Sequence, residues 1–105
     1  MSFKNLQAHE ALAWLESDQA LFVDIRDPQS YAAGHIRGAL ALNNDNVAQF
    51  VREQDKTRPV VVCCYHGMSS QNAAQFLFEQ GFSEAYSLAG GYEQWKHLYP
   101  EQCTA

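Results

Sequence analysis

A short segment of this chain gathers several reactive side chains, because Cys64, His66, Ser69 and Ser70 lie within seven residues. A cysteine reacts as its thiolate, and the pKa of the thiol falls when backbone N–H groups and a helix N-terminus point at the sulfur. Gly67 can adopt positive φ, so a short loop here can curl until its N–H groups face one centre. The segment therefore favours an anion and predicts that Cys64 is a nucleophile near neutral pH.

Two neighbouring cysteines, Cys63 and Cys64, compete for that role. Successive side chains along a strand point to opposite faces, so only one of the pair can face the segment that follows. Cys64 opens that segment and is our choice. Cys63 is expected to be a small buried apolar side chain, as cysteine often is. A third cysteine, Cys103, is expected to be an idle thiol in a mobile C-terminal tail.

The side chains after Cys64 are expected to line a binding loop. His66 can supply positive potential or donate a hydrogen bond to an oxyanion, and it can equally be a solvent-facing residue. Ser69 and Ser70 are expected to cap the helix that follows, although a hydroxyl turned inward can also steady a sulfur anion. The candidate site residues beside Cys64 are therefore Tyr65, His66, Gly67, Met68, Ser69 and Ser70.

A metal site is the other interpretation of Cys63, Cys64 and His66. Zinc needs four converging ligands at paired spacings, and here two of the three candidates diverge. We therefore expect neither a metal nor a cofactor.

Apolar runs alternate with helical patterns, and they place the Cys64 loop between a strand and a helix. Continuous apolar runs, typical of strands covered on both faces, occupy residues 21–25, 60–63 and, more weakly, 39–42 and 85–88. Apolar residues at helical spacing predict helices near residues 8–17, 47–51, 73–77 and 92–99. Asp27 and Pro28 read as an N-cap and the first residue of a further helix. The order favours an α/β domain with a parallel sheet, whose reactive groups sit at the carboxyl ends of its strands.

Length and composition fit one globular domain spanning residues 1–105, of which 47% are hydrophobic. Seven Lys and Arg against twelve Asp and Glu give a net charge of −5, which argues against nucleic acid as a partner. No apolar run reaches the length of a membrane span. Three cysteines, two of them adjacent, suit a disulfide framework badly, so a reducing cytoplasm is expected.

Three motifs follow one another along the chain. The first has two parts, since residues 23–28 read Val-Asp-Ile-Arg-Asp-Pro and residues 34–39 read Gly-His-Ile-Arg-Gly-Ala. The loop reads Cys-Tyr-His-Gly before a serine pair, and residues 90–95 read Gly-Gly-Tyr-Glu-Gln-Trp. Together these motifs resemble the rhodanese family, and more closely its single-domain bacterial thiosulfate sulfurtransferases of the GlpE type. The resemblance covers about residues 6–99 and leaves a short C-terminal tail.

The resemblance implies a fold and an activity. The fold is a rhodanese-like α/β domain with a central parallel sheet of about five strands, flanked by helices on both faces. The activity is a double displacement in which the Cys64 thiolate takes the outer sulfur of thiosulfate, sulfite leaves and a Cys64 persulfide forms. A thiophilic acceptor then removes the sulfur. The acceptor is cyanide, giving thiocyanate, or a dithiol such as thioredoxin, giving sulfide and a disulfide.

Other residues match the family signatures without any need to touch substrate. Asp24 and Arg26 read as an ion pair that braces the end of a strand, and His35 is placed with them as a supporting residue. Gly90 and Gly91 are expected to form a tight backbone turn.

One departure from the family concerns the residues directly after the cysteine. Two-domain members carry two basic residues there, which can bind the thiosulfate dianion, whereas this chain has Tyr65 and His66. Weaker binding of thiosulfate is therefore expected.

Three other functions are alternatives to sulfur transfer from thiosulfate. A cysteine phosphatase or arsenate reductase has a related fold, but its loop is longer and ends in an Arg that grips the phosphoryl group, which residues 65–70 lack. A non-catalytic module that binds a protein is disfavoured by the presence of Cys64. A persulfide carrier, loaded by another protein's cysteine, uses the same Cys64 chemistry with a different donor and stays an alternative.

Overall fold

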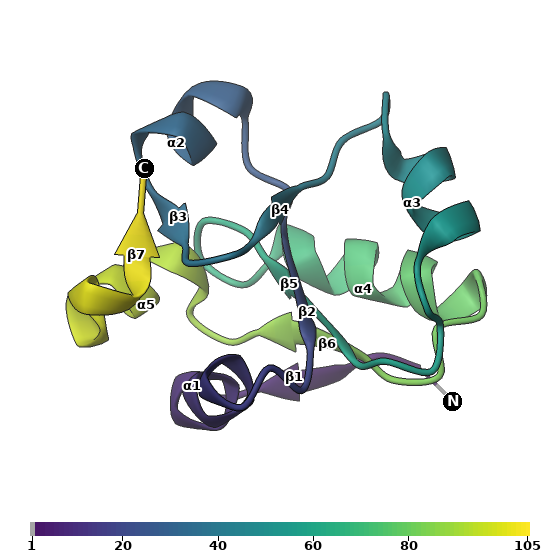
Figure 1. The fold of residues 1–105 in the computed structure, drawn as a ribbon, viewed down its shortest axis with the longest axis horizontal. Helices are drawn as coiled ribbons and strands as arrows, with labels where there is room; N and C mark the ends of the chain where they lie inside the picture. The colour runs from purple at the N-terminus through teal and green to yellow at the C-terminus, as the bar shows by residue number, and fades with distance from the viewer. Residues whose placement is uncertain (1) are drawn as a thin grey trace.

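Strands and helices largely alternate along the chain, with two strands in succession between residues 35 and 41. The computed structural model describes residues 2–105. Its strands are β1 (Lys4–Leu6), β2 (Leu21–Asp24), β3 (His35–Ile36), β4 (Leu40–Ala41), β5 (Val60–Cys63), β6 (Ala85–Leu88) and β7 (Cys103–Thr104). Its helices are α1 (Ala8–Glu16), α2 (Pro28–Ala33), α3 (Val47–Glu53), α4 (Ser69–Glu79), α5 (Gly91–Leu98) and the 3₁₀ helix η1 (Pro100–Gln102) (Figure 1).

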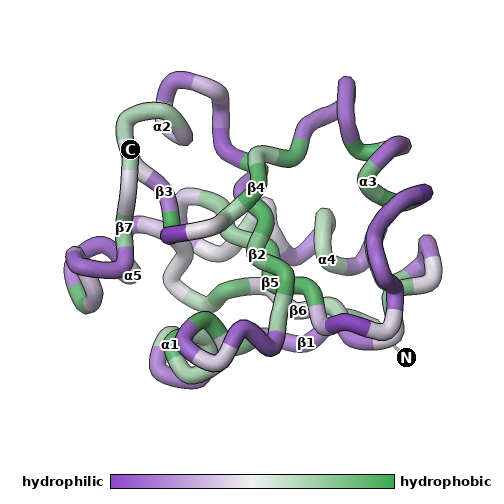
Figure 2. The backbone as a smooth tube through the Cα atoms, in the orientation of Figure 1, coloured by the Kyte–Doolittle hydropathy of each residue, from purple (hydrophilic) through white to green (hydrophobic). Residues whose placement is uncertain are grey.

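A five-stranded sheet forms the centre of the structure, with the strand order β1-β6-β5-β2-β4 (Figure 1). All four pairings between neighbouring strands are parallel, which confirms the expected α/β architecture. The central strand β5 is buried along its whole length. Strands covered on both faces carry continuous apolar runs, which explains the sequence of β5. Figure 2 accordingly shows the most hydrophobic backbone at the middle of the sheet.

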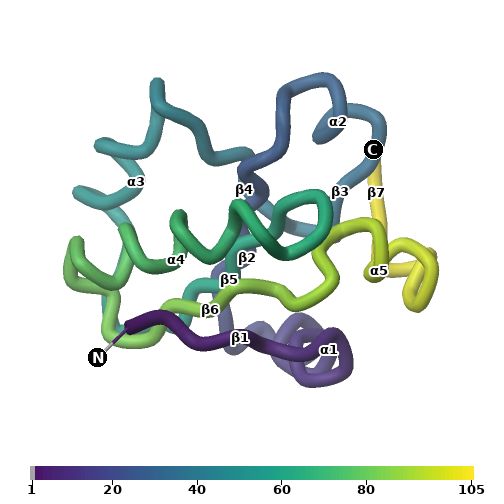
Figure 3. The backbone as a smooth tube through the Cα atoms, turned by 180° about the vertical axis from the view of Figure 1, so that it is seen from behind, coloured from purple at the N-terminus to yellow at the C-terminus, as the bar shows by residue number. Residues whose placement is uncertain are grey.

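Helices cover both faces of this sheet, and each face has its own apolar cluster. Side chains of α1 and α5 pack on one face with Val61 and Cys63, while side chains of α3 and α4 pack on the other with Val60 and Val62. Viewed from behind, α4 crosses the near face (Figure 3). The alternation along β5 therefore sends Cys63 toward α1 and α5, as expected for a buried apolar side chain.

The carboxyl ends of the central strands meet at one edge of the sheet. The N–H of Ile25, just after β2, donates to the carbonyl of Cys63 at the end of β5 over 3.0 Å. The N–H of Tyr92, just after the turn that leaves β6, donates to the carbonyl of Cys64 over 2.8 Å. Loops leaving β2, β5 and β6 are thus joined where reactive groups are expected in such a sheet.

Helix α2 begins as predicted from its first two residues. The side chain of Asp27 accepts a hydrogen bond from the N–H of Ser30 at 3.1 Å, and Pro28 is the first helical residue. A carboxylate at this position satisfies an N–H group that otherwise has no partner in the helix. Gly34 ends the helix.

Two small features of the fold have no counterpart in the sequence-based expectations. Edge strand β1 carries only three residues, two of them polar, so it shows no apolar run. Strands β3 and β7 form a separate antiparallel pair in which Ile36 lies opposite Cys103. The expectation that Cys103 lies in a mobile tail is therefore wrong, because its backbone is held in this pair and its side chain is half-buried.

Residues 2–105 lack two further classes of feature. No helix there is long and apolar enough to cross a membrane. Within the same residues, no three His, Cys, Asp or Glu side chains converge in the way that a metal ion requires.

Candidate active site

The site is centred on the sulfur of Cys64, which follows the last residue of β5. Cys63 points into the apolar cluster beneath α1 and α5 and is fully buried, whereas Cys64 turns into the loop between β5 and α4. Burial raises the pKa of the Cys63 thiol well above its ordinary value, chiefly because the apolar surroundings disfavour its charged form. Of the two candidates, the structure therefore places Cys64 among donors and leaves Cys63 in the core.

Two N–H donors and one hydroxyl group lie around the Cys64 sulfur. The N–H of Gly67 donates to it at 3.1 Å and the N–H of Ser70 at 3.3 Å, while the Ser70 hydroxyl oxygen lies 3.2 Å away. Burial raises the pKa of the Cys64 thiol, but the bonds from Ser70 and Gly67, with a weaker contribution from the N–H of His66, outweigh it. The net result is a pKa below the ordinary value, so the thiolate is stabilised.

Gly67 is required at its position in the loop for two reasons. Its φ of +91° is a conformation that side chains rarely adopt. A Cβ there would also lie 3.0 Å from the Gly90 nitrogen and 3.1 Å from the Leu88 carbonyl oxygen. This conformation turns the Gly67 N–H toward the sulfur, as the sequence predicts. It also packs the loop against the turn after β6, which the sequence does not predict.

The first turn of α5 holds the other side of the loop. The N–H of Tyr92 donates to the carbonyl of Cys64, and the N–H of Glu93 donates to that of Tyr65 at 3.1 Å. Gly91 makes this approach possible, because a Cβ on it would lie 2.5 Å from the Tyr65 carbonyl oxygen. The expected tight turn at Gly90 and Gly91 is confirmed, with φ of +79° and +61°. Two helix N-termini thus meet the loop, with α4 facing the sulfur and α5 facing the carbonyls.

The expected capping role of Ser69 and Ser70 is wrong. The N-cap of α4 is Met68, and no side chain caps this helix. Ser69 is exposed, whereas Ser70 is completely buried with its hydroxyl turned toward Cys64. The Ser70 hydroxyl is therefore engaged at the sulfur, which was the other possibility for these serines.

Sequence reasoning missed one polar residue behind the site. Ser87, on β6, is fully buried, and its hydroxyl oxygen lies 2.7 Å from that of Ser70. The signal available in the sequence is weak: a single serine within the apolar segment of β6. Which side chain such a serine faces depends on sheet order, which the sequence does not state.

Asp24 and Arg26 form the expected ion pair at the end of β2. The Arg26 guanidinium donates to both carboxylate oxygens of Asp24 at 2.8 to 3.0 Å and to the carbonyl of Gly34 at 2.6 Å. It also lies over the rings of Tyr92 and Tyr65, 4.1 Å and 5.9 Å from their centroids. With its side chain only 4% exposed, Arg26 braces the strand end and is occupied by protein partners.

The other predicted residues are dispersed around the loop. Tyr65, His66 and Met68 are exposed, with 72% of Met68 accessible to solvent. His35 lies apart from them, since both its hydrogen bond and its ring stacking are with Tyr31 of α2. The structure therefore brings Gly67 and Ser70 to the sulfur and leaves Tyr65, His66, Met68 and Ser69 exposed to solvent.

Comparison with known proteins agrees with this geometry. The family model described as "Rhodanese-like domain" matches residues 7–98. A protein of Pseudomonas entomophila named thiosulfate sulfurtransferase GlpE is 54% identical over 93% of this chain and 89% of its own length. A protein of the same name from Pseudoalteromonas translucida is 46% identical over 97% of both chains.

A solved structure shares the fold as well as part of the sequence. The rhodanese-like domain of the Anabaena protein Alr3790, determined by solution NMR, superposes with a TM-score of 0.79 and is 29% identical. The match covers 90% of this chain and 74% of that one. Because the family model spans most of the chain and the relatives match nearly end to end, this chain belongs to the rhodanese-like domain family.

Proposed function

We propose that this protein is a thiosulfate sulfurtransferase that carries sulfur as a persulfide on Cys64. The observation that carries the proposal is the set of donors around the Cys64 sulfur, which stabilise a thiolate without any cationic side chain. The names of the relatives in Pseudomonas entomophila and Pseudoalteromonas translucida support the same activity. Cys64 is the catalytic residue, and the loop from Tyr65 to Ser70 is the binding site.

In the first half-reaction, the Cys64 thiolate attacks the outer sulfur of thiosulfate. A new S–S bond forms to Cys64 while the S–S bond within thiosulfate breaks, and its electron pair leaves with sulfite. The Cys64 thiolate and the thiosulfate dianion thus become a persulfide anion and a sulfite dianion. The negative charge stays within the loop, where the N–H groups of Gly67 and Ser70 and the N-terminus of α4 face it.

In the second half-reaction, an acceptor attacks the outer sulfur of the persulfide. Cyanide takes it as thiocyanate, and the Cys64 thiolate is restored. A dithiol such as reduced thioredoxin takes it in two steps, ending as a disulfide with release of hydrogen sulfide. Both routes return Cys64 to the thiolate that its surroundings favour.

Transfer of a phosphoryl group fits the site poorly. Its equatorial oxygens need a bidentate cation, and Arg26, the arginine beside the loop, is already bound to Asp24 and Gly34. A persulfide carrier loaded by another protein remains the second candidate, because Tyr65 and His66 stand where a dianion could be held by basic side chains.

We place the protein in a reducing compartment, the cytoplasm. Cys63, Cys64 and Cys103 are all free, and the proposed reaction needs Cys64 as a thiolate.

Intact-mass spectrometry before and after exposure to thiosulfate tests the proposal. One added sulfur, about 32 Da, is expected on the protein, and cyanide or a dithiol should remove it. Cys64→Ser should abolish the addition, whereas Cys63→Ala should retain it. If thiosulfate adds nothing while a protein persulfide loads Cys64 rapidly, the carrier replaces the sulfurtransferase; loading lost only in Cys63→Ala contradicts the choice of nucleophile.

A further inference from the structure

Three polar atoms form a buried chain that starts at the reactive sulfur. The Cys64 sulfur lies 3.2 Å from the Ser70 hydroxyl oxygen, which in turn lies 2.7 Å from that of Ser87. Cys64 is 3% exposed and the two serines are 0% exposed. Water therefore does not compete for these hydroxyls, and each proton must find its acceptor within the protein.

Ser87 has one hydrogen-bond partner for its hydroxyl within residues 2–105, and that partner is Ser70. Its backbone sits in the middle of the sheet, where β6 pairs Ser87 with Val62 on β5 and with Asn5 on β1. The two neighbouring strands, β1 and β5, hold the backbone of Ser87 from both sides. Its oxygen is thus a rigid point against which the Ser70 hydroxyl is oriented.

Counting protons determines the direction of the chain. When Cys64 is a thiolate, the two serine protons serve the two contacts only in the order Ser87 to Ser70 to sulfur. In the reverse order the Ser87 proton has no acceptor, and a buried donor without an acceptor is costly. When Cys64 is a thiol, the chain holds three protons, one each on Cys64, Ser70 and Ser87. Only two contacts join these groups, so one proton has no acceptor within the chain.

We propose that Ser87 is a positioning residue for Cys64: its hydroxyl donates to the Ser70 oxygen and so directs the Ser70 proton at the sulfur. Donation from Ser87 also polarises the Ser70 hydroxyl and strengthens the bond that Ser70 makes to a thiolate. This role deepens the proposed function, because it rests on Cys64 being the thiol that reacts. Ser87 itself touches neither the sulfur nor a substrate.

Several titratable groups lie on the elements around the sulfur, and none is altered by the variants below. They are Asp24 and Arg26 at the end of β2, Cys63 on β5, His66 on the loop, and Tyr92 and Glu93 on α5. Asp24 is paired with Arg26, and the N–H groups of Tyr92 and Glu93 serve the loop carbonyls. A change in the ionisation of Cys64 in serine variants therefore reports on the hydroxyl chain.

The test is the pH dependence of Cys64 alkylation by iodoacetamide, with the modified residue located by fragment-ion mass spectrometry. Only the thiolate reacts, so the midpoint of the rate profile is the pKa of Cys64. Ser70→Ala should lower the rate at a fixed pH below the midpoint about tenfold, since it removes a bond to a charged group. Ser87→Ala should lower it about threefold through loss of polarisation and orientation.

The double variant separates positioning from a structural effect. If Ser87 acts through Ser70, then Ser87→Ala added to Ser70→Ala changes the midpoint no further. The proposal is overturned if Ser87→Ala leaves the midpoint of the pH–rate profile unchanged. It is also overturned if Ser87→Ala shifts that midpoint equally in the wild type and in the Ser70→Ala background. Ser83→Ala, just before β6, is the control. Within residues 2–105 the Ser83 hydroxyl bonds only to the Lys56 carbonyl, so its removal should leave the midpoint as in wild type.

A second pair of variants covers the case in which Ser87→Ala folds poorly. Ser87→Thr and Ser87→Val have the same shape, but only Thr keeps the hydroxyl. Thr should retain the wild-type midpoint and Val should raise it, and equal midpoints would overturn the proposal. Thiosulfate loading is measured in parallel on the wild type. Its absence would contradict the proposed function, whereas the alkylation profile tests Ser87 whatever the sulfur donor is.

Discussion

The hydroxyl of Tyr65 donates to the carboxylate of Asp27, so the residue directly after Cys64 is tied to the N-cap of α2. The Ser30 hydroxyl donates to the same carboxylate at 2.7 Å. The bonds from Tyr65 and Ser30 lower the pKa of Asp27 to about 2. Its carboxylate is therefore ionised at any pH near neutrality, and a fixed negative charge borders the loop.

Removing the negative charge of Asp27 is expected to strengthen the binding of an anionic sulfur donor such as thiosulfate. In Asp27→Asn, the amide oxygen at the Oδ1 position can still accept from Tyr65, whereas an NH2 group replaces the Oδ2 that accepts from the Ser30 N–H. The tie to Tyr65 therefore survives, while the cap is weakened. We expect the KM for thiosulfate to fall about twofold at low salt, with kcat unchanged, and the difference to shrink as salt is added. Steady-state kinetics with cyanide as the acceptor measure both constants.

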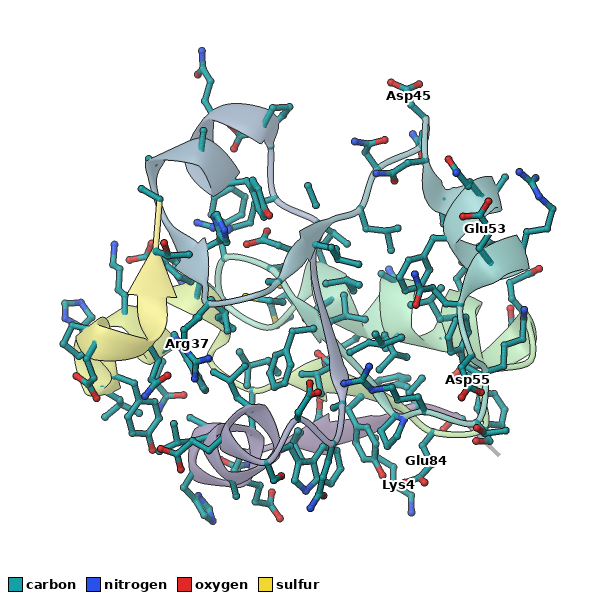
Figure 4. The ribbon with its side chains drawn as sticks, in the orientation of Figure 1. Lys4, Arg37, Asp45, Glu53, Asp55 and Glu84 are labelled. Atoms are coloured by element: carbon teal, nitrogen blue, oxygen red, sulfur yellow. The ribbon has the colours of Figure 1, made fainter. Side chains whose placement is uncertain are left out.

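The control for this variant is Asp45→Asn, which makes the same change in net charge. Asp45 is exposed, and its side chain points outward beside α3, away from the sheet (Figure 4). The KM for thiosulfate should stay at the wild-type value in this variant. Equal effects of the two substitutions would assign the result to net charge and remove any special role for Asp27.

Substitution at Gly91 is expected to disrupt the loop. Gly91→Ala places a Cβ 2.5 Å from the Tyr65 carbonyl oxygen, in addition to the strain of a φ of +61°. Gly38 provides a matched comparison, because its φ is +80° but no atom lies within 4 Å of the added Cβ. Urea unfolding should give a loss of about 1 kcal/mol for Gly38→Ala and at least twice that for Gly91→Ala.

Activity should separate the same two variants. Gly91→Ala is expected to lose most sulfur transfer because the loop is pushed from α5, whereas Gly38→Ala should keep wild-type kcat. Equal activity in the two variants would mean that the contact between the loop and α5 is dispensable.

Breaking the buried ion pair is expected to be costly for stability. Asp24→Asn leaves the Arg26 guanidinium, which is 4% exposed, without its counter-charge, and a loss of about 3 to 5 kcal/mol is expected. The comparison is Asp18→Asn, which breaks a pair with Arg58 in which the Asp18 side chain is 91% exposed. That change should cost less than about 1 kcal/mol. Urea unfolding of both variants measures the two values, and similar losses would show that burial of the pair has no special weight.

Met68 is expected to contribute to protein acceptors but not to small ones. It is apolar, 72% exposed and placed on the loop that holds the sulfur, so a protein that reaches the persulfide must pass beside it. Met68→Gln should lower the rate with reduced thioredoxin severalfold and leave the rate with cyanide unchanged. Leu98→Gln, at the exposed far end of α5, should change neither rate.

Much of the fold follows from sequence pattern alone. The apolar runs of β2, β5 and β6 and the helical spacing of α1 and α4 are continuous enough to be recognised. The choice of Cys64 over Cys63 needs the alternation of a strand and the place of Cys64 at the start of the loop. Strand β1 is not predicted from the sequence, because its partner β6 lies some eighty residues away and the pairing leaves no local signal.

The site is less predictable than the fold for a related reason. Ser70 lies at a helix start, where serines usually cap, but the turn at Gly67 rotates it inward to the sulfur. The orientation of Ser87 depends on β6 lying beside β5, and the position of Cys103 depends on a pairing with β3. The positions of these three residues depend on neighbours that are distant in the sequence, and local sequence propensity carries no information about such neighbours.

Most of the groups that face the sulfur belong to the main chain. The N–H groups of Gly67 and Ser70 are present whatever side chains flank them, and only the Ser70 hydroxyl depends on residue type. Tyr65, His66 and Met68 point outward from the same loop. The loop therefore separates two tasks. Its interior stabilises the sulfur anion through main-chain N–H groups, and its exposed side chains are free to contact other molecules. Because the Tyr65 hydroxyl is bound to Asp27, exchange of His66 and Met68 offers the more direct way to vary the sulfur donors and acceptors while the proposed nucleophile stays intact.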